Sequence, residues 1–172
     1  AIEYTDSYFV RDHAASAGKI HPEVYQLAEP VSPHLAAALE GRTIGLDQIR
    51  LPETDNLIIV ESAGGILSPL ATGITMAELA IHLGLPVILV SMNYLGSINH
   101  TLLSAEALRS RNIPIAGIIF NGPVVPSTET YILEATGLLQ LGRIDQTEAV
   151  SPEFIRSQAL NFDHFHELVG KR

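Results

Sequence analysis

The apolar run Pro86-Val87-Ile88-Leu89-Val90 determines the fold class, because comparable runs recur along the chain. Leu57-Ile58-Ile59-Val60 and Ile115-Ala116-Gly117-Ile118-Ile119-Phe120 are equally unbroken, and a more mixed run covers residues 138–144. Continuous runs rich in β-branched residues are typical of strands that are buried on both faces of a parallel sheet. The sequence therefore predicts four such strands.

Helical patterns lie between these runs. Residues 75–83 predict a helix that ends at Gly84, residues 97–111 predict a second helix with Asn112 as its left-handed stop, and residues 127–135 predict a third. Strand and helix in alternation give right-handed parallel crossovers, so we expect an α/β three-layer sandwich with a mostly parallel sheet. An amphipathic pattern in residues 151–172 predicts a terminal helix; its members are Phe154, Ile155, Gln158, Phe162, Phe165 and Leu168.

Composition limits the class of protein. The chain has 172 residues, 47% of them hydrophobic and 17% charged, which predicts one globular domain over residues 1–172. It contains no run of the ~18 apolar residues that a membrane span needs. Ten Lys and Arg against nineteen Asp and Glu give a net charge of -9, which argues against a nucleic-acid partner. A nucleotide stays possible, because a helix N-terminus and a metal ion can neutralise phosphate locally.

The chain contains no cysteine. This excludes disulfides, iron-sulfur clusters, thiolate zinc sites and cysteine nucleophiles. No signal peptide opens the sequence, so we expect a cytoplasmic protein. The seven histidines show no metal-ligand spacing, and we expect no zinc site.

Each predicted strand is followed by a polar or glycine-containing segment. Ligands of parallel sheets bind at the carboxyl ends of the strands, so these segments are where chemistry is expected. They form one coherent edge and not scattered loops. The four segments are Glu61-Ser62-Ala63-Gly64-Gly65, Ser91-Met92-Asn93-Tyr94-Leu95-Gly96-Ser97, Asn121-Gly122-Pro123 and Asp145-Gln146-Thr147.

Two carboxylates are candidate metal ligands. Glu61 could reach Mg²⁺ while Gly64 and Gly65 let backbone N–H groups approach a phosphate; the alternative is a solvated acid beside an ordinary turn. Asp6 either caps a helix, a role that Thr5 could also take, or provides a second metal carboxylate. Sequence spacing does not show that Asp6 and Glu61 meet.

Two polar segments are candidate ligand-binding elements. Gly96-Ser97-Ile98-Asn99-His100 predicts a helix start with Ser97 as the cap, and its free N–H groups could bind an anion. A plain capped helix is the alternative, and His100 is assigned no catalytic role. Asn121 could present a donor and an acceptor to adenine, or could form a turn before Gly122.

In their order along the chain, these segments resemble the dethiobiotin synthase family. The resemblance covers nearly the whole chain and becomes loose after about Gly142. It implies a P-loop NTPase-like fold and an ATP-dependent ligase of biotin biosynthesis, which carboxylates 7,8-diaminopelargonic acid with CO₂ and closes a cyclic urea. The segments that carry it are Thr5-Asp6, residues 29–37, Val60 to Gly65, Pro69-Leu70, residues 85–90, Tyr94 to Thr101 and Gly117 to Gly122.

The resemblance also implies roles for individual residues. Those assigned to ATP are Asp6, Glu61, Ser62, Ala63, Gly64, Gly65, Asn121, Gly122, Asp145, Gln146 and Thr147, with Asp6 and Glu61 holding Mg²⁺ and Asn121 and Gly122 meeting adenine. Those assigned to the diamine substrate are Gly64, Gly96, Ser97, Ile98 and Asn99. In the family the last four bind the distal carboxylate across a twofold interface, so the resemblance implies a homodimer.

The chain departs from the family in its phosphate loop. No Gly-x-x-x-x-Gly-Lys-[Ser/Thr] motif occurs, and neither Lys19 nor Lys171 follows a glycine-rich loop. Ser62 stands where family members usually have glycine, and Asp145 stands where they often have proline. The chain starts without methionine, and we expect it to be a crop of a longer enzyme. The chain as given should contain no catalytic residue and should be inactive, because the phosphate loop is lacking. The loss of a central strand should also leave edges of the sheet exposed.

Two other functions stay open at this point. One is a degenerate, non-catalytic homodimer that only binds a carboxylate ligand. The other is a different P-loop amidoligase or a partitioning-type ATPase, which would share the Glu-x-Ala-Gly-Gly segment. Both of these relatives lack the Gly-Ser-Ile-Asn-His helix start that this chain has from Gly96 to His100.

Overall fold

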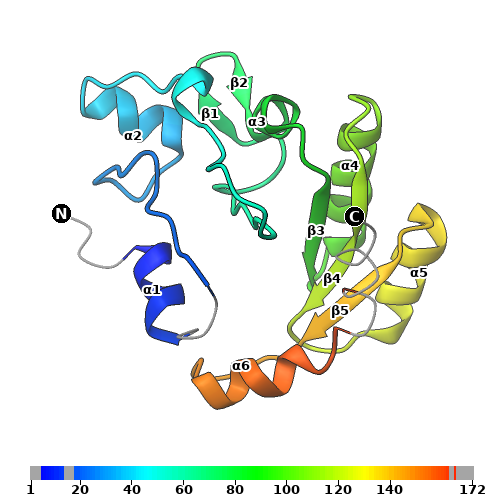
Figure 1. Cartoon of the computed structure of the whole chain (residues 1–172). Coiled ribbons are helices and arrows are strands. Elements are labelled where there is room, and N and C mark those ends of the chain that lie inside the picture. Colours follow the sequence, from blue (N-terminus) through cyan, green and yellow to red (C-terminus); the bar gives the residue numbers. More distant parts are fainter. Residues whose placement is uncertain (1–4, 14–17, 163–164, 166–172) are drawn as a thin grey trace. The chain divides into compact units, whose positions relative to one another are not determined.

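The structure is a computed structural model that describes residues 5–13, 18–162 and 165. The chain divides into two compact units, residues 1–84 and 85–172 (Figure 1). Each unit contains its own cluster of buried apolar side chains.

The second unit contains a parallel sheet of three strands in the order β3-β4-β5. The strands are β3 (Val87–Met92), β4 (Ile115–Asn121) and β5 (Gln140–Ile144). Helix α4 (Ser97–Arg109) connects the first two, and α5 (Pro126–Thr136) connects the last two. Three predicted strands and the helices between them are thereby confirmed, as is the α/β class.

The two faces of this sheet differ. Ile118 and Phe120 of β4 are fully buried with Ile132 of α5, and α4 and α5 lie on the same side of the strands (Figure 1). Residues that alternate with these along a strand point to the other face. On that face Val90 and Met92 of β3, an edge strand, are 63% and 53% exposed.

The start of α4 differs from the prediction. Gly96 is the N-cap, with a left-handed φ of 104°, and Ser97 is the first helical residue with a buried side chain. Ser97 is therefore not the cap, because the chain reversal falls one residue earlier, at the glycine that tolerates it. The predicted stop is confirmed: Asn112 has a φ of 56° just beyond the helix.

The first unit is built mainly from helices and turns. They are α1 (Asp6–His13), α2 (Pro33–Leu39), a short 3-10 helix η1 (Leu46–Gln48) and α3 (Met76–Leu83), with a two-stranded antiparallel sheet of β1 (Pro69–Ala71) and β2 (Ile74–Thr75). The predicted helix α3 is confirmed, with Thr75 and Glu78 forming a capping box and Gly84 ending it at a φ of 64°. The core of the unit contains Ala37, Ile44, Leu70, Met76 and Leu79.

The strand predicted at residues 57–60 is wrong. The segment is not in a strand, and Leu57 and Ile59 are 48% and 79% exposed instead of buried. A strand exists only by hydrogen bonding to a neighbour, and β1 and β2, the strands described in this unit, pair with each other. An apolar run without a partner strand cannot become a buried strand.

The predicted terminal helix is shorter than its pattern. Helix α6 (Pro152–Ala159) is capped by the Ser151 hydroxyl, and Phe162 and Phe165 follow it with their ring centroids 6.3 Å apart. Leu168 lies outside the described residues. Among the helices that the structure describes, none is long and apolar enough to cross a membrane.

Candidate functional site

The carboxyl ends of the three parallel strands are aligned. Met92 pairs with Asn121, and Asn121 pairs with Ile144, so the segments that follow β3, β4 and β5 begin at one edge. Because the predicted polar segments of this unit start here, the structure brings together the residues around Asn93, Asn121 and Asp145. This edge is the candidate site of the second unit.

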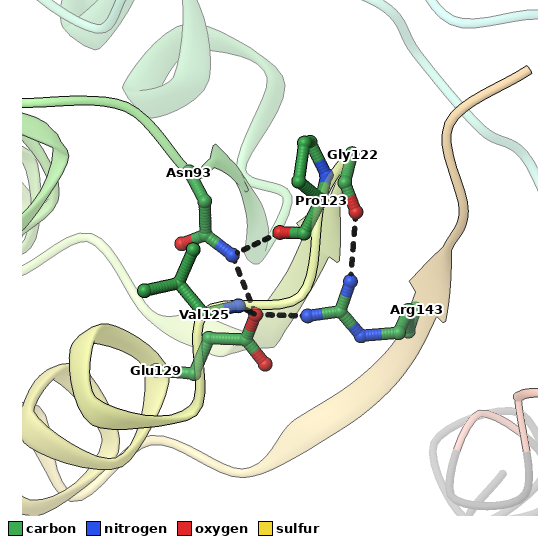
Figure 2. A network of polar contacts seen from close by, with 6 residues as sticks. All are labelled: Asn93, Gly122, Pro123, Val125, Glu129 and Arg143. Atoms are coloured by element: carbon green, nitrogen blue, oxygen red, sulfur yellow. Dashed lines mark hydrogen bonds and ion pairs between the residues drawn. The ribbon is translucent and has the colours of Figure 1, made fainter.

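A buried polar cluster, formed by Asn93, Glu129 and Arg143, joins the three strand ends (Figure 2). The Glu129 carboxylate on α5 accepts hydrogen bonds from the Asn93 amide and from the Val125 N–H, at 2.5 and 3.2 Å. Arg143 on β5 forms an ion pair with the same carboxylate. The charges are largely shielded from water, since both side chains are less than one-sixth exposed.

Burial and pairing have opposite effects on Glu129. Burial raises the pKa of its carboxyl, but donation from Arg143, Val125 and Asn93 outweighs burial, so the pKa lies below its ordinary value. Glu129 is therefore charged at neutral pH. The cluster therefore links α5 to β5 and to the segment after β3, and it braces these elements against one another.

The cluster holds the turn at Asn121, Gly122 and Pro123. Arg143 Nη1 donates to the Gly122 carbonyl at 2.9 Å, and Asn93 Nδ2 donates to the Pro123 carbonyl at 2.8 Å. The Gly122 N–H donates to the Ile144 carbonyl at 2.9 Å. The Asn121 carboxamide has no hydrogen-bond partner among the described residues. Asn121 is half-buried at this edge of the sheet.

The sequence prediction missed Asn93, Glu129 and Arg143 as a cluster. Arg143 offered one signal, because a cation inside a predicted buried strand needs a partner. The carboxylate that supplies it is 14 residues away on another element, so spacing alone could not pair them.

The segment after β5 is tied to the terminal helix. Asp145, Gln146 and Thr147 are exposed, and Gln158 of α6 accepts the Asp145 N–H at 2.8 Å. Phe162 packs directly over Gly142 of β5, where an added Cβ would lie 2.6 Å from the ring. The region beyond β5 therefore contacts the sheet on which the candidate site lies.

The predicted anion site at the start of α4 has one unusual feature. Ser97 is 2% exposed, and its hydroxyl has no hydrogen-bond partner among the described residues. Ser97 follows Gly96 and precedes Ile98 and Asn99 in the sequence, and of these neighbours Gly96 and Asn99 are exposed. A buried hydroxyl without a partner is uncommon, and a helix N-terminus carries partial positive charge. The two features together suit an anionic group.

The Glu61 segment belongs to the first unit. Glu61, Ser62, Ala63, Gly64 and Gly65 are all exposed, and Gly64 has a φ of 83°. The turn that follows is bonded to α3: Met76 N–H donates to Ser68 at 3.1 Å, and Ala77 N–H donates to Ile66 at 2.9 Å. The turn thus satisfies N–H groups at the start of α3.

Asp6 is the first residue of α1 and is exposed. Glu23 supports this helix start by accepting the Ser7 N–H at 2.9 Å and the Ser7 hydroxyl at 3.1 Å. Burial opposes the charge of Glu23, but these bonds lower its pKa to about 2. Asp6 and Glu61 each keep a carboxylate without a described partner.

The donor chemistry of Asp6 and Glu61 fits Mg²⁺, which prefers carboxylate oxygens and often takes only one or two of them with substrate phosphates. No group of three potential metal ligands occurs in the part of the chain that the structure describes.

Comparison with known proteins gives consistent matches. A family model described as "AAA domain" matches residues 3–154. The ATP-dependent dethiobiotin synthetase BioD of Cytophaga hutchinsonii is 44% identical over 169 residues, which cover 96% of this chain and 82% of that protein. The proteins of the same name from Rhodopseudomonas palustris and Brucella ovis are each 41% identical; the matches cover 86% and 98% of this chain, and 70% and 80% of those proteins.

Proposed function

The chain belongs to the ATP-dependent dethiobiotin synthetase family, and on this premise we propose that it takes part in the carboxylation and ring closure of 7,8-diaminopelargonic acid. The amine is carbamated by CO₂, the γ-phosphoryl group of ATP passes to the carbamate, and the second amine closes the cyclic urea as phosphate leaves. Biotin biosynthesis is the role that the family name supports.

The proposed nucleotide site uses the aligned strand ends of the second unit. Asn121 reads the base with its carboxamide, which has no hydrogen-bond partner among the described residues, and Gly122 allows close approach. Asp145, Gln146 and Thr147 flank the base from the next strand end. The single observation that carries this assignment is the Asn121 carboxamide: it lies at an aligned sheet edge, beside a braced turn, without a described partner.

The proposed phosphate and metal residues lie in the first unit. We propose that Asp6 and Glu61 hold Mg²⁺, which neutralises charge on the transferring phosphoryl group, and that Ser62 to Gly65 line the phosphates. The exposure of both carboxylates supports this role. Gly64 also contacts the diamine in this proposal.

The proposed diamine carboxylate site is the start of α4, contributed across a homodimer interface. Gly96, Ser97, Ile98 and Asn99 form it. The buried hydroxyl of Ser97 supports an anionic ligand here, since a carboxylate oxygen would accept a hydrogen bond from it. A dimer in solution, measured by sedimentation, is expected.

Two further parts of the proposal concern the chain as a whole. The 172 residues contain no Gly-x-x-x-x-Gly-Lys-[Ser/Thr] motif, and we propose that on their own they do not turn over ATP, because the cradle for the β- and γ-phosphates is missing. A cytoplasmic location is also proposed.

Coupled turnover tests this function. The native full-length protein should release phosphate from ATP only when 7,8-diaminopelargonate and bicarbonate are both present, with Mg²⁺ removal abolishing release. Phosphate release that is indifferent to the diamine would overturn the proposal. Binding of the diamine without any phosphate release would favour the degenerate carboxylate-binding alternative.

A further inference from the structure

We propose that Asn93, Glu129 and Arg143 are positioning residues that present an acceptor-only backbone turn to the nucleobase, and that they thereby select a base with an exocyclic amino group over one with a carbonyl. The inference rests on the proposed nucleotide site. The sequence analysis assigned no role to Glu129 or Arg143, and Asn93 entered it only as a member of the segment after the second predicted strand.

The polarity of the turn follows from its hydrogen bonds. The Gly122 N–H is already donated to Ile144, and Pro123 has no N–H. The turn therefore has no free backbone donor at these two residues. Its carbonyls, on Gly122 and Pro123, each accept one side-chain hydrogen bond and keep a second lone pair.

The buried cluster fixes the direction of these two carbonyls. Arg143 donates to Gly122 and Asn93 donates to Pro123, while Glu129 holds both donors from α5 (Figure 2). Glu129 is itself 9% exposed, so solvent does not compete for its bonds. The turn cannot reorient either carbonyl without breaking a bond of the cluster.

Fixed acceptors discriminate between bases. The 6-amino group of adenine donates hydrogen bonds and can satisfy such a carbonyl, whereas the 6-oxo group of hypoxanthine presents another acceptor and leaves two lone pairs opposed. ATP and inosine triphosphate have the same sugar and phosphates and share the purine frame. The ratio of their kcat/KM values therefore isolates the base contact, and it does not depend on how much of a preparation is folded.

The test measures this ratio in the native full-length protein and in Arg143→Met. We expect the wild type to favour ATP by at least about tenfold, and the variant to lose most of that preference through a higher KM for ATP, with the KM for the diamine unchanged. Arg143→Lys keeps one donor and should restore part of the ratio. Arg109→Met is the matched control, because Arg109 also donates to a backbone carbonyl, that of Thr136. Both residues lie at the C-terminal ends of their helices, α4 and α5, whereas the candidate site lies at the N-terminal ends.

Removing Arg143 leaves Glu129 buried without its cation, and the single variant could fail to fold. Glu129→Gln/Arg143→Met removes both charges together and decides the question in that case. A preserved ratio in the folded variant, or equal use of both nucleotides by the wild type, overturns the inference. A wild type that turns over neither nucleotide refutes the proposed function instead.

Discussion

Gln158 of α6 holds Asp145 at two points: its side-chain oxygen accepts the Asp145 N–H at 2.8 Å, and its amide nitrogen donates to the Asp145 carboxylate at 3.4 Å. The helix after the sheet thereby orders the segment beyond β5. This relationship gives residues 145–147 a fixed start, although all three are exposed.

Gln158→Ala should therefore weaken nucleotide binding more than it weakens the fold. We expect a stability loss of about 1 kcal/mol or less, since these hydrogen bonds are exposed, and a severalfold rise in the KM for ATP. Arg156→Gln on the same helix removes only an exposed ion pair with Glu153 and is the control. Equal KM values in the two variants would show that α6 does not position this segment.

The pH dependence of the first unit should depend on Glu23. Its pKa is about 2 in the folded protein against an ordinary value of 4.5, so its contribution to stability is present above about pH 4.5 and is lost as the pH falls toward 2. The free energy of unfolding, measured by urea titration, should be higher for the wild type than for Glu23→Gln above about pH 4.5, and this gap should narrow as the pH falls toward 2. Glu53→Gln controls for the change in net charge. A gap that is constant with pH would contradict the assignment.

Much of the second unit could be predicted from sequence, because its signals are local. The runs at β3 and β4 are apolar along their length, and Asn112 marks the end of the helical segment after β3 by its left-handed backbone conformation. Residues 57–60 carry the same local signal and are not a strand. A sheet requires a neighbour, and the presence of a neighbour is not a local property.

The same limit applies to the site. Asn121 was predictable because it directly follows an apolar run, so its place at a strand end is set by the chain itself. Glu129 was not, because its role depends on Asn93, 36 residues earlier, and on Arg143, 14 residues later. Such contacts between separate elements form only when the chain has folded, so local sequence patterns do not reveal them.

Gly64 should tolerate a side chain far less well than its neighbour Gly65. Gly64 has a φ of 83°, and an added Cβ would lie 2.9 Å from the Ser68 hydroxyl oxygen, whereas at Gly65 the nearest atom is 3.8 Å away. We expect Gly64→Ala to lower the free energy of unfolding by about 1 kcal/mol or more, and Gly65→Ala by less than about 0.5 kcal/mol.

Gly64→Ala/Ser68→Ala separates the two causes of this loss. It removes the close oxygen but leaves the left-handed backbone, so it should recover only part of the stability. Equal stabilities of Gly64→Ala and Gly65→Ala in urea titrations would mean that the turn does not require a glycine at this position.

Two buried serines of the second unit provide an internal comparison for the anion site. Ser91 is 5% exposed and shares a 2.8 Å hydrogen bond with Thr101, whereas the hydroxyl of Ser97, at 2% exposure, has no described partner. Ser91→Ala breaks a buried pair and should cost about 1 kcal/mol or more. Ser97→Ala removes only an unsatisfied group and should leave stability unchanged or slightly higher.

The effect on substrate affinity should be the reverse. If the Ser97 hydroxyl donates to the carboxylate of the diamine, Ser97→Ala raises the KM for the diamine by about tenfold and leaves the KM for ATP unchanged, because a hydrogen bond to a charged group contributes more than one between neutral groups. Steady-state kinetics of the native full-length protein with each substrate varied in turn measures both values. A Ser97→Ala enzyme with an unaltered KM for the diamine would remove the hydroxyl from the proposed carboxylate site.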